Sequence, residues 1–319
     1  MLRVAITGAS GLIGSGLAEA LLGRGDEVVG FSRDPNRAAA AGNPQIAWRA
    51  CDLAASPPES STLRGVDAIV NLAGEPINQR WNEAAKQRIM ASRVDATANL
   101  VRAIADSAEA PGVLVSGSAV GYYGDSGDRE VDETGAPGSS FDCLVCERWE
   151  KAAEAARQSG VRVAISRTGL VLDRRGGLLK DLLVPFRLGV GGPVAGGDQY
   201  MPWIHLDDLV ALLIWLIDSE FAQGPYNATA PNPINNRDFS KALGKALGRP
   251  AVMAIPKAAL RLRLGRELAA VAAGGTRAVP KRALAEGFRF THPNLGAALT
   301  DVLSRRWEQV VLPARGGGG

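Results

Sequence analysis

The sequence predicts an α/β fold, in which a parallel, doubly wound sheet is followed by a smaller, mainly helical C-terminal lobe. Short apolar segments rich in β-branched residues alternate with longer segments whose apolar residues recur at helical spacing. Small or polar residues follow several of the apolar segments, as expected where parallel strands end at one edge of a sheet. The chain has 319 residues, enough for one such domain and a smaller lobe.

The first expected strand and helix enclose a glycine-rich turn. LRVAIT, residues 2–7, precedes GASGLIG, and SGLAEALLGRG then has a helical pattern. A side chain at this turn would keep the backbone away from a pyrophosphate, or push the helix off the strand. The pattern therefore predicts a Rossmann-type dinucleotide site with phosphates at the helix N-terminus, the alternative being an ordinary tight turn. The residues assigned to it are Gly8, Ser10, Gly11, Leu12, Ile13 and Gly14.

The second expected strand, residues 26–35, ends in Ser32 and Arg33. A site for NAD usually has an acidic residue here, which binds the ribose 2′-hydroxyl. A hydroxyl and a guanidinium instead suit a 2′-phosphate, through charge-assisted hydrogen bonds. We therefore predict NADP(H) as the cofactor. Two alternatives stay open: Asp34 turns toward the ribose, or Arg33 is a solvated surface charge.

The alternation of strands and helices continues along the chain. Strands are expected within residues 46–53, 66–74, 112–124 and 161–172, and a long helix over 83–105. Because ligands of a doubly wound sheet bind at the carboxyl ends of its strands, the loops 73–80, 116–123 and 167–169 are expected to line the site.

Several long motifs resemble a known family. TGASGLIG, CDL at 51–53, NLAG at 71–74 and SGSAVGYYG resemble the extended short-chain dehydrogenase/reductases, in the NAD-dependent epimerase/dehydratase family. NLAGEPINQRW, LGVGGPVAGGDQYMPWIHLDDL and the C-terminal GF-x-F-x-HP-x-L pattern are similar, more narrowly, to the SDR39U1-type epimerase-like family with its DUF1731-type segment. The resemblance covers nearly the whole chain, residues 1–303.

The resemblance implies further cofactor contacts. Asp52 and Leu53 would lie by the adenine, and the stretch after residue 71 would touch the dinucleotide. The residues assigned there are Leu72, Ala73, Gly74, Glu75 and Arg80. A salt bridge with a neighbouring acid is the alternative for Arg80. Arg93 in the long helix either faces the site or is exposed, and we assign it no role.

The catalytic residues that the resemblance implies are incomplete. Superfamily enzymes hold the substrate oxygen with a Ser or Thr and exchange a proton through a Tyr, whose pKa a Lys four residues later lowers. Ser118 fits the serine position, with Ser116 as its competitor. Alignment on Glu150, however, puts Asp142 and Cys146 at the Tyr and Lys positions.

We therefore predict Ser118, Tyr122 and Tyr123 as the catalytic residues. The two tyrosines follow the fifth expected strand, near the expected nicotinamide position, but the sequence shows no neighbour that would tune either phenol. An untuned phenol has a pKa of about 10 and is a poor base at neutral pH.

The other chemistry-bearing residues are expected to be structural. Cys143 and Cys146 form a Cys-x-x-Cys pair, but Cys51 and two distant histidines do not complete a four-ligand zinc motif, so no metal is predicted. Packed, reduced thiols are the expectation. His205 is expected to be structural, and a proton-transfer role near pH 7 is the alternative.

Composition argues against several classes of partner. A net charge of +3, without a run of Lys or Arg, predicts no nucleic-acid binding. No charge-free apolar run reaches about 18 residues, so no membrane span is expected. Three cysteines and a start that does not read as a signal peptide predict a cytoplasmic protein. We further expect a monomer or homodimer that acts on an unidentified small-molecule substrate.

The expected domains are an NADP-binding domain over residues 1–224, with a substrate-covering segment near 178–205, a C-terminal lobe over 225–303, and a disordered tail over 304–319. Two functions stay open. The first is an oxidoreductase or epimerase with a divergent proton relay, acting on a small carbonyl or hydroxyl compound. The second is a non-catalytic NADP(H)-binding sensor or regulator, which the absent Tyr-x-x-x-Lys pair favours.

Overall fold

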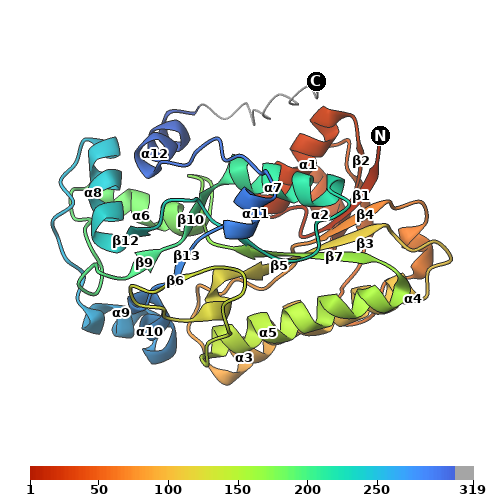
Figure 1. Ribbon diagram of the computed structural model, residues 1–319, viewed down its shortest axis with the longest axis horizontal. Helices are drawn as coiled ribbons and strands as arrows, with labels where there is room; N and C mark the ends of the chain where they lie inside the picture. Colours follow the sequence, from red (N-terminus) through yellow and green to blue (C-terminus); the bar gives the residue numbers. More distant parts are fainter. Residues whose placement is uncertain (306–319) are drawn as a thin grey trace.

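A seven-stranded parallel sheet forms the centre of the computed structural model, which describes residues 1–305 (Figure 1). Its strands run in the order β11-β7-β5-β4-β1-β2-β3, so the strand order reverses between β1 and β4. This confirms the predicted Rossmann-type α/β fold. The strands are β1 (Arg3–Thr7), β2 (Glu27–Ser32), β3 (Ala47–Ala50), β4 (Ala68–Asn71), β5 (Val113–Ala119), β7 (Arg162–Thr168) and β11 (Gly224–Ala228).

Helices cover both faces of this sheet (Figure 1). On one face, Leu17 and Leu21 of α1 pack with Leu213 of α7 against apolar strand residues. On the other face, Leu100 and Ile104 of α4 fill a second core. Complete burial of such side chains stabilises the fold by about 1.5–3 kcal/mol each. The helices around the sheet are α1 (Leu12–Arg24), α2 (Pro35–Ala41), α3 (Glu83–Met90), α4 (Ala96–Ala105), α5 (Phe141–Glu154) and α7 (Leu206–Asp218), with short turns η1 (Ser60–Leu63), η2 (Ala91–Asp95), η3 (Val120–Tyr123) and η4 (Ala155–Ser159).

The C-terminal elements have a core of their own, in which Trp203, Phe186 and Phe239 are fully buried. Its helices are α6 (Gly177–Arg187), α8 (Asn236–Leu247) and α12 (Leu295–Ser304). The other C-terminal helices are α9 (Lys257–Leu264), α10 (Arg266–Ala273) and α11 (Lys281–Ala285). Three strand pairs join them to the rest: β8 (Leu170–Leu172) with β10 (Trp203–His205), β9 (Tyr200–Met201) with β12 (Ile234–Asn235), and β6 (Glu130–Val131) with β13 (Arg277–Ala278).

The predicted domain boundary falls within the sheet's last strand. β11 begins at Gly224 and pairs with β7, so the chain enters the helical lobe only after this strand. The division at residue 225 stays a prediction, and the predicted tail lies outside the described residues from position 306. Over the described residues, no helix is both long and apolar enough to cross a membrane.

Helix α7 is tied to the C-terminal lobe at its first turn. His205 Nδ1 accepts a hydrogen bond from the backbone N–H of Asp207 at 3.1 Å, so the neutral ring carries its proton on Nε2. Nε2 lies 3.1 Å from Asp301 Oδ2, and the ring stacks on His292 with centroids 3.8 Å apart. Arg305 also pairs with Asp301. His205, His292 and Asp301 have ligand atoms within 4.8 Å of one another, a spacing that could also hold a metal ion. Here the hydrogen bonds and ring stacking among these side chains connect α7 to α12.

Acid is expected to weaken the fold through His205. Burial, followed by the nearby His292, lowers the pKa of His205 from 6.5 to about 4. Between these pH values the unfolded chain binds a proton that the folded protein does not, so the free energy of unfolding falls as pH falls. The loss by pH 4 is on the order of a few kcal/mol.

Urea unfolding from pH 7 to pH 4 measures this effect. His205→Gln has no group to titrate at this position, so its free energy of unfolding should fall less steeply than that of the wild type. Equal slopes for the two proteins would contradict the assignment.

Candidate functional site

The glycine turn has the close backbone contacts that its spacing predicts. Gly8 has a φ of +73°, and the Gly11 N–H donates to its carbonyl oxygen at 2.9 Å. A Cβ at Gly14 would lie 2.2 Å from that same oxygen, which no side chain tolerates. Helix α1 then begins at Leu12, with no side-chain cap and no acidic residue in its first turn. Its N-terminal N–H groups and dipole are therefore available to an anion.

The end of β4 lies directly against this turn. Thr7 Oγ1 accepts hydrogen bonds from the N–H groups of Leu72 and Ala73, both at 3.0 Å, and donates to Asn71 Oδ1 at 2.7 Å. A Cβ at Gly8 would lie 3.0 Å from the carbonyl group of Leu72. Two predicted groups of cofactor residues, far apart in sequence, thus meet at the reversal of strand order. This shape fits a dinucleotide, because backbone atoms alone line the narrowest part.

The end of β2 presents an unpaired arginine. Ser32 Oγ accepts from the Asp34 N–H at 3.1 Å, and Asp34 Oδ1 caps α2 by accepting from the Arg37 N–H at 3.0 Å. The Asp34 carboxylate is therefore engaged in the helix cap. Arg33 is exposed, and within residues 1–305 no acid forms an ion pair with it. This arrangement leaves the guanidinium available to a phosphate.

Asp52 and Leu53 follow β3, which pairs with β2. Asp52 is exposed, whereas Leu53 is buried and its carbonyl oxygen accepts from Asn99 Nδ2 at 2.8 Å. Both residues lie on the same side of the glycine turn as Ser32, so an adenosine contact from them stays a prediction.

Glu75 and Arg80, both assigned to the cofactor, bind different partners in the structure. Glu75 Oε1 accepts from Gln79 at 3.2 Å and from Arg88 at 3.4 Å. Arg80 instead donates to the carbonyl oxygens of Leu262 and Arg263, at the end of α9. Its guanidinium therefore caps a helix of the C-terminal lobe, in place of the salt bridge that was its alternative. The cofactor role assigned to Arg80 stays a prediction.

Ser118 belongs to a buried cluster of charged side chains. Its hydroxyl donates to Glu150 Oε1 at 2.7 Å, and Arg167 binds both oxygens of that carboxylate, each at 2.8 Å. The Arg167 and Glu150 side chains are 4% and 10% exposed. This two-pronged pairing compensates for the desolvation of both charges and holds the serine in one orientation.

Arg167 is also the cationic neighbour of both predicted tyrosines. Its guanidinium carbon lies 3.6 Å from the centroid of the Tyr122 ring, and Nη1 donates to Tyr123 Oη at 2.9 Å. The Tyr123 hydroxyl in turn donates to Asn227 Oδ1 at 2.7 Å. Burial raises the pKa of Tyr122 and raises that of Tyr123 to about 12, while Arg167 opposes both shifts. The phenols are therefore protonated at neutral pH, with a cation in place to stabilise their anions.

Asp142 and Cys146, which the resemblance assigns to the superfamily's Tyr and Lys positions, both lie on α5. Burial raises the pKa of the Cys146 thiol to about 12, and it also raises the pKa of the Asp142 carboxyl group. Cys143 is buried beside Ser140 Oγ, at 2.9 Å, and Cys51, Cys143 and Cys146 are all free thiols. The cysteine pair thus packs within the protein, as expected.

The sequence analysis missed the roles of Arg167, Glu150, Asn227 and Glu133. Arg167 ends a strand whose loop was expected to line the site, so its position was the available signal. Asn227 carries no such signal, because it reaches Tyr123 from 104 residues away. Glu133 accepts N–H groups of Asn227 at 3.0 Å and of Arg282 at 3.2 Å, which joins the tyrosine loop to α11.

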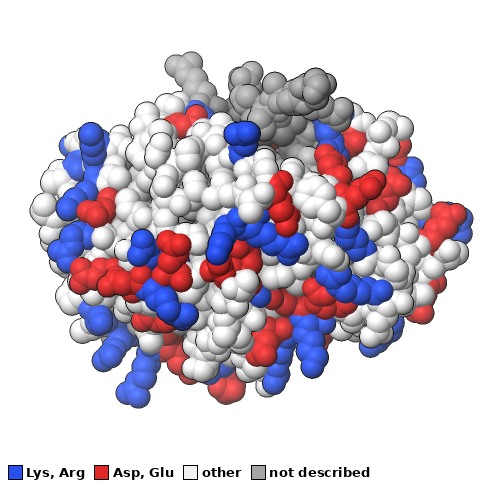
Figure 2. Space-filling view, viewed as in Figure 1, with Lys and Arg blue, Asp and Glu red and all other residues white. Residues whose placement is uncertain are grey.

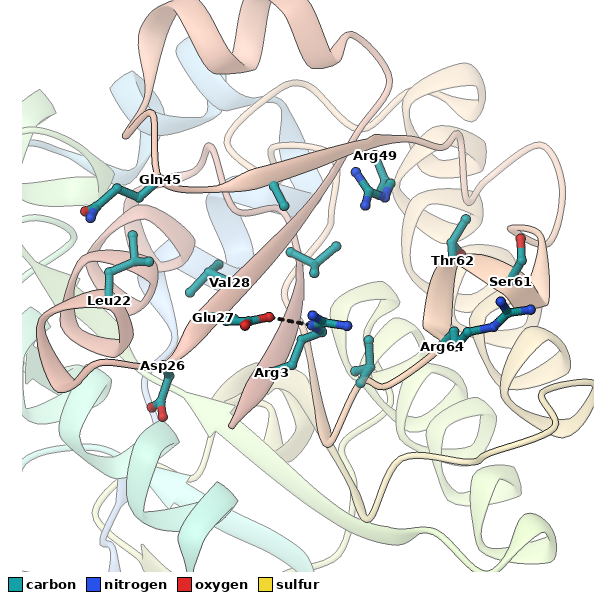
Figure 3. Close-up of a pocket in the computed structure, with 13 residues that line it drawn as sticks. Arg3, Leu22, Asp26, Glu27, Val28, Gln45, Arg49, Ser61, Thr62 and Arg64 are labelled. Atoms are coloured by element: carbon teal, nitrogen blue, oxygen red, sulfur yellow. Dashed lines mark hydrogen bonds and ion pairs between the residues drawn. The ribbon is translucent and has the colours of Figure 1, made fainter. Parts of the chain in front are cut away.

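A separate cavity lies away from this edge of the sheet. This cavity of about 430 Å³ lies at the opposite, amino ends of β1, β2 and β3, where Arg3 pairs with Glu27 at 2.6 Å (Figure 3). Acidic and basic side chains are interspersed over the face in Figure 2, without an exclusively basic surface there.

The sheet order and the glycine turn define a Rossmann-type protein with a turn suited to a dinucleotide. A model of the NAD dependent epimerase/dehydratase family matches residues 4–228, and a domain of unknown function, DUF1731, matches residues 255–302. The chain belongs to the NAD dependent epimerase/dehydratase family, which confirms the resemblance seen in its motifs.

Relatives match along nearly the whole chain. Epimerase family protein SDR39U1 of Bos taurus is 40% identical over 309 residues, covering 95% of this chain and 100% of the relative. Epimerase family protein YfhF of Bacillus subtilis is 31% identical, with coverage of 96% and 99%. The crystal structure of human SDR39U1 (isoform2) with NADPH superimposes with a TM-score of 0.84 at 35% identity, covering 94% of this chain and 99% of that one.

Substitution of Gly14 is expected to damage the turn. Gly14→Ala places a Cβ 2.2 Å from the Gly8 carbonyl oxygen, so strand and helix must separate. We expect its free energy of unfolding to fall by about 1–3 kcal/mol, as for other overpacked sites. Gly23→Ala is the matched control in the same helix, because no atom lies within 4 Å of its added Cβ.

Chemical denaturation of the two variants tests this. Gly23→Ala should raise the free energy of unfolding by up to about 1 kcal/mol through helix propensity. If both alanines change stability in the same direction and to the same extent, the steric explanation is wrong.

Proposed function

We propose that this protein binds NADP(H) and is an oxidoreductase or epimerase acting on a small carbonyl or hydroxyl compound. The observation that carries the proposal is the cluster of Ser118, Glu150, Arg167 and Tyr122. It lies at the carboxyl ends of β5 and β7, on the same edge of the sheet as the glycine turn. A cytoplasmic location and a monomeric or homodimeric state are part of the same proposal.

Three features support NADP(H) as the cofactor. The turn at Gly8, Gly11 and Gly14 leaves room for a pyrophosphate. Arg33 is exposed at the end of β2, while Asp34 is occupied as a helix cap. The human relative that shares 35% identity was crystallised with NADPH. A guanidinium in place of an acid favours the phosphorylated dinucleotide over NAD.

The residues of the cluster have distinct roles in this proposal. When bound, the cofactor supplies or accepts a hydride at its nicotinamide ring. The Tyr122 hydroxyl would donate a proton to the substrate oxygen, and Ser118 would hold that oxygen after its hydroxyl turns away from Glu150 Oε1. Arg167, stacked on the ring, stabilises the phenolate that remains. Tyr123 is a positioning residue, because its hydroxyl is committed to Asn227 and Arg167.

The second candidate is a non-catalytic NADP(H)-binding sensor or regulator. Asp142 and Cys146 support it, because they stand where the superfamily places Tyr and Lys and both have raised pKa values. In this case NADPH would bind with no turnover of any carbonyl compound, and a partner would be recovered only in its presence.

The cofactor preference is tested with Arg33→Met. Loss of a charge-assisted phosphate contact should weaken NADPH binding by about tenfold or more, and leave NADH affinity within about twofold. Titrations of intrinsic fluorescence give both dissociation constants. Equal affinity of the wild type for NADPH and NADH would contradict the proposed 2′-phosphate site.

Turnover is tested with Tyr122→Phe, which keeps the ring under Arg167 and removes only the hydroxyl. Loss of a general acid should lower kcat about 10²–10⁴-fold, with NADPH affinity unchanged. NADPH oxidation with a panel of carbonyl compounds provides the assay, and Ser118→Ala should also lower kcat. Saturable NADPH binding without turnover in the wild type would favour the sensor instead.

A further inference from the structure

The long helix predicted over residues 83–105 is interrupted in its middle. Helix α3 ends at Met90, a π-helical turn runs over η2 (Ala91–Asp95), and α4 begins at Ala96. A π turn inserts an extra residue and re-aims the side chains around it, and such turns recur at functional sites. Arg93 lies in the middle of this turn.

The π turn directs Arg93 to the end of β4. Arg93 Nη1 donates to the carbonyl oxygen of Glu75 at 3.0 Å and contacts that of Ile89 at 3.4 Å. A Cβ at Gly74 would lie 2.9 Å from the guanidinium carbon and from Nη2. The guanidinium therefore packs directly against Gly74, and a side chain at this position would have to displace it.

The charge of Arg93 meets backbone carbonyl oxygens and the Trp149 ring, whose centroid lies 5.3 Å from the guanidinium carbon, but no ion pair within the described part of the chain. Among residues 1–305 no carboxylate forms an ion pair with it, because Glu75 Oε1 bonds Gln79 and Arg88 instead. Arg93 is half-buried, and desolvation lowers its pKa, opposed by Cys146 and Glu75. A desolvated cation without a counter-charge is costly to the folded protein. Such a group is expected where a ligand brings oxygen acceptors or negative charge.

The strand order identifies which half of a dinucleotide Arg93 would meet. β2 and β3, with Ser32 and Asp52 at their ends, lie on one side of the glycine turn, and β4 and β5 lie on the other. With the pyrophosphate on the turn and the adenosine toward β2, the nicotinamide half extends past β4. Gly74 lies in the loop after β4, and Ser118 lies in the last two residues of β5.

We infer that Arg93 binds the ribose and phosphate oxygens of the nicotinamide half of NADP(H), which makes it a cofactor residue supplied by the π turn. This inference rests on the proposed binding of NADP(H). Gly74 contributes to the same site, because its missing side chain leaves space for the Arg93 guanidinium.

The experiment compares two ligands that share the adenosine half. Dissociation constants for NADPH and for adenosine 2′,5′-bisphosphate are measured by fluorescence titration for the wild type, Arg93→Met and Arg93→Lys. Arg93→Met should bind NADPH about tenfold to a hundredfold more weakly, the loss expected for hydrogen bonds to a charged group. Its affinity for adenosine 2′,5′-bisphosphate should stay within about twofold, and Arg93→Lys should recover part of the lost NADPH affinity.

Arg102→Met is the matched control. Arg102 is exposed on α4, nine residues later and on the opposite side of the helical path. It should bind both ligands as the wild type does. Arg33→Met should weaken both ligands, because both contain the 2′-phosphate.

Three outcomes would overturn the inference. Equal weakening of both ligands by Arg93→Met would show that Arg93 only supports the fold, and unchanged NADPH affinity would show that it does not contact the nicotinamide half. If the wild type bound NADPH no more tightly than adenosine 2′,5′-bisphosphate, the nicotinamide half would contribute no affinity, and the inference would also be wrong. A wild type that binds neither ligand would instead refute the proposed function itself.

Discussion

The close approach of three backbone segments at Gly8 is the constraint on which the carboxyl edge of the sheet depends. The Gly8 carbonyl oxygen occupies the space of a Gly14 side chain, and Gly8 itself adjoins Leu72. Thr7 closes this junction by accepting the N–H groups that begin the next loop. Because no side chain intervenes, the helix N-terminus and the ends of β1 and β4 form one surface on which a pyrophosphate fits.

The buried pair of Arg167 and Glu150 organises the other end of this edge. A buried ion pair costs desolvation energy, which good geometry and additional hydrogen bonds offset. Here both carboxylate oxygens are bound, and the remaining donors and faces of Arg167 meet Tyr123 and Tyr122. One cation thus orients Ser118 through Glu150 and adjoins two phenols. In the proposed mechanism it does the electrostatic work that a Lys on α5 does in the superfamily.

The C-terminal lobe is attached to two loops at this edge of the sheet. Arg80, in the loop after β4, caps α9, while Glu133 joins the tyrosine loop to α11. The lobe also holds β6 through β13. Any displacement of the lobe therefore acts on loops that belong to the candidate site, which gives the DUF1731 segment a physical connection to the proposed chemistry.

The sequence by itself determined the features that depend on local spacing. Strand and helix periodicity and three glycines in a turn are each readable within about a dozen residues, so the parallel sheet and the glycine turn followed from pattern. The role of Ser118 instead came from the resemblance of its loop to a known family. The π turn at Arg93 left no such trace, because a helical sequence does not show where one extra residue is accommodated.

The tertiary structure alone decided the partners. Glu150 lies 32 residues from Ser118 and 17 from Arg167, and Asn227 lies 104 from Tyr123. Arg80 turned to a helix end 182 residues away, and Arg93 turned to Gly74. A long arginine side chain can reach many hydrogen-bond acceptors, and the packing of strands and helices decides which acceptor lies close to it. That choice is made by the whole fold, so the residues around a charged side chain in sequence do not reveal it.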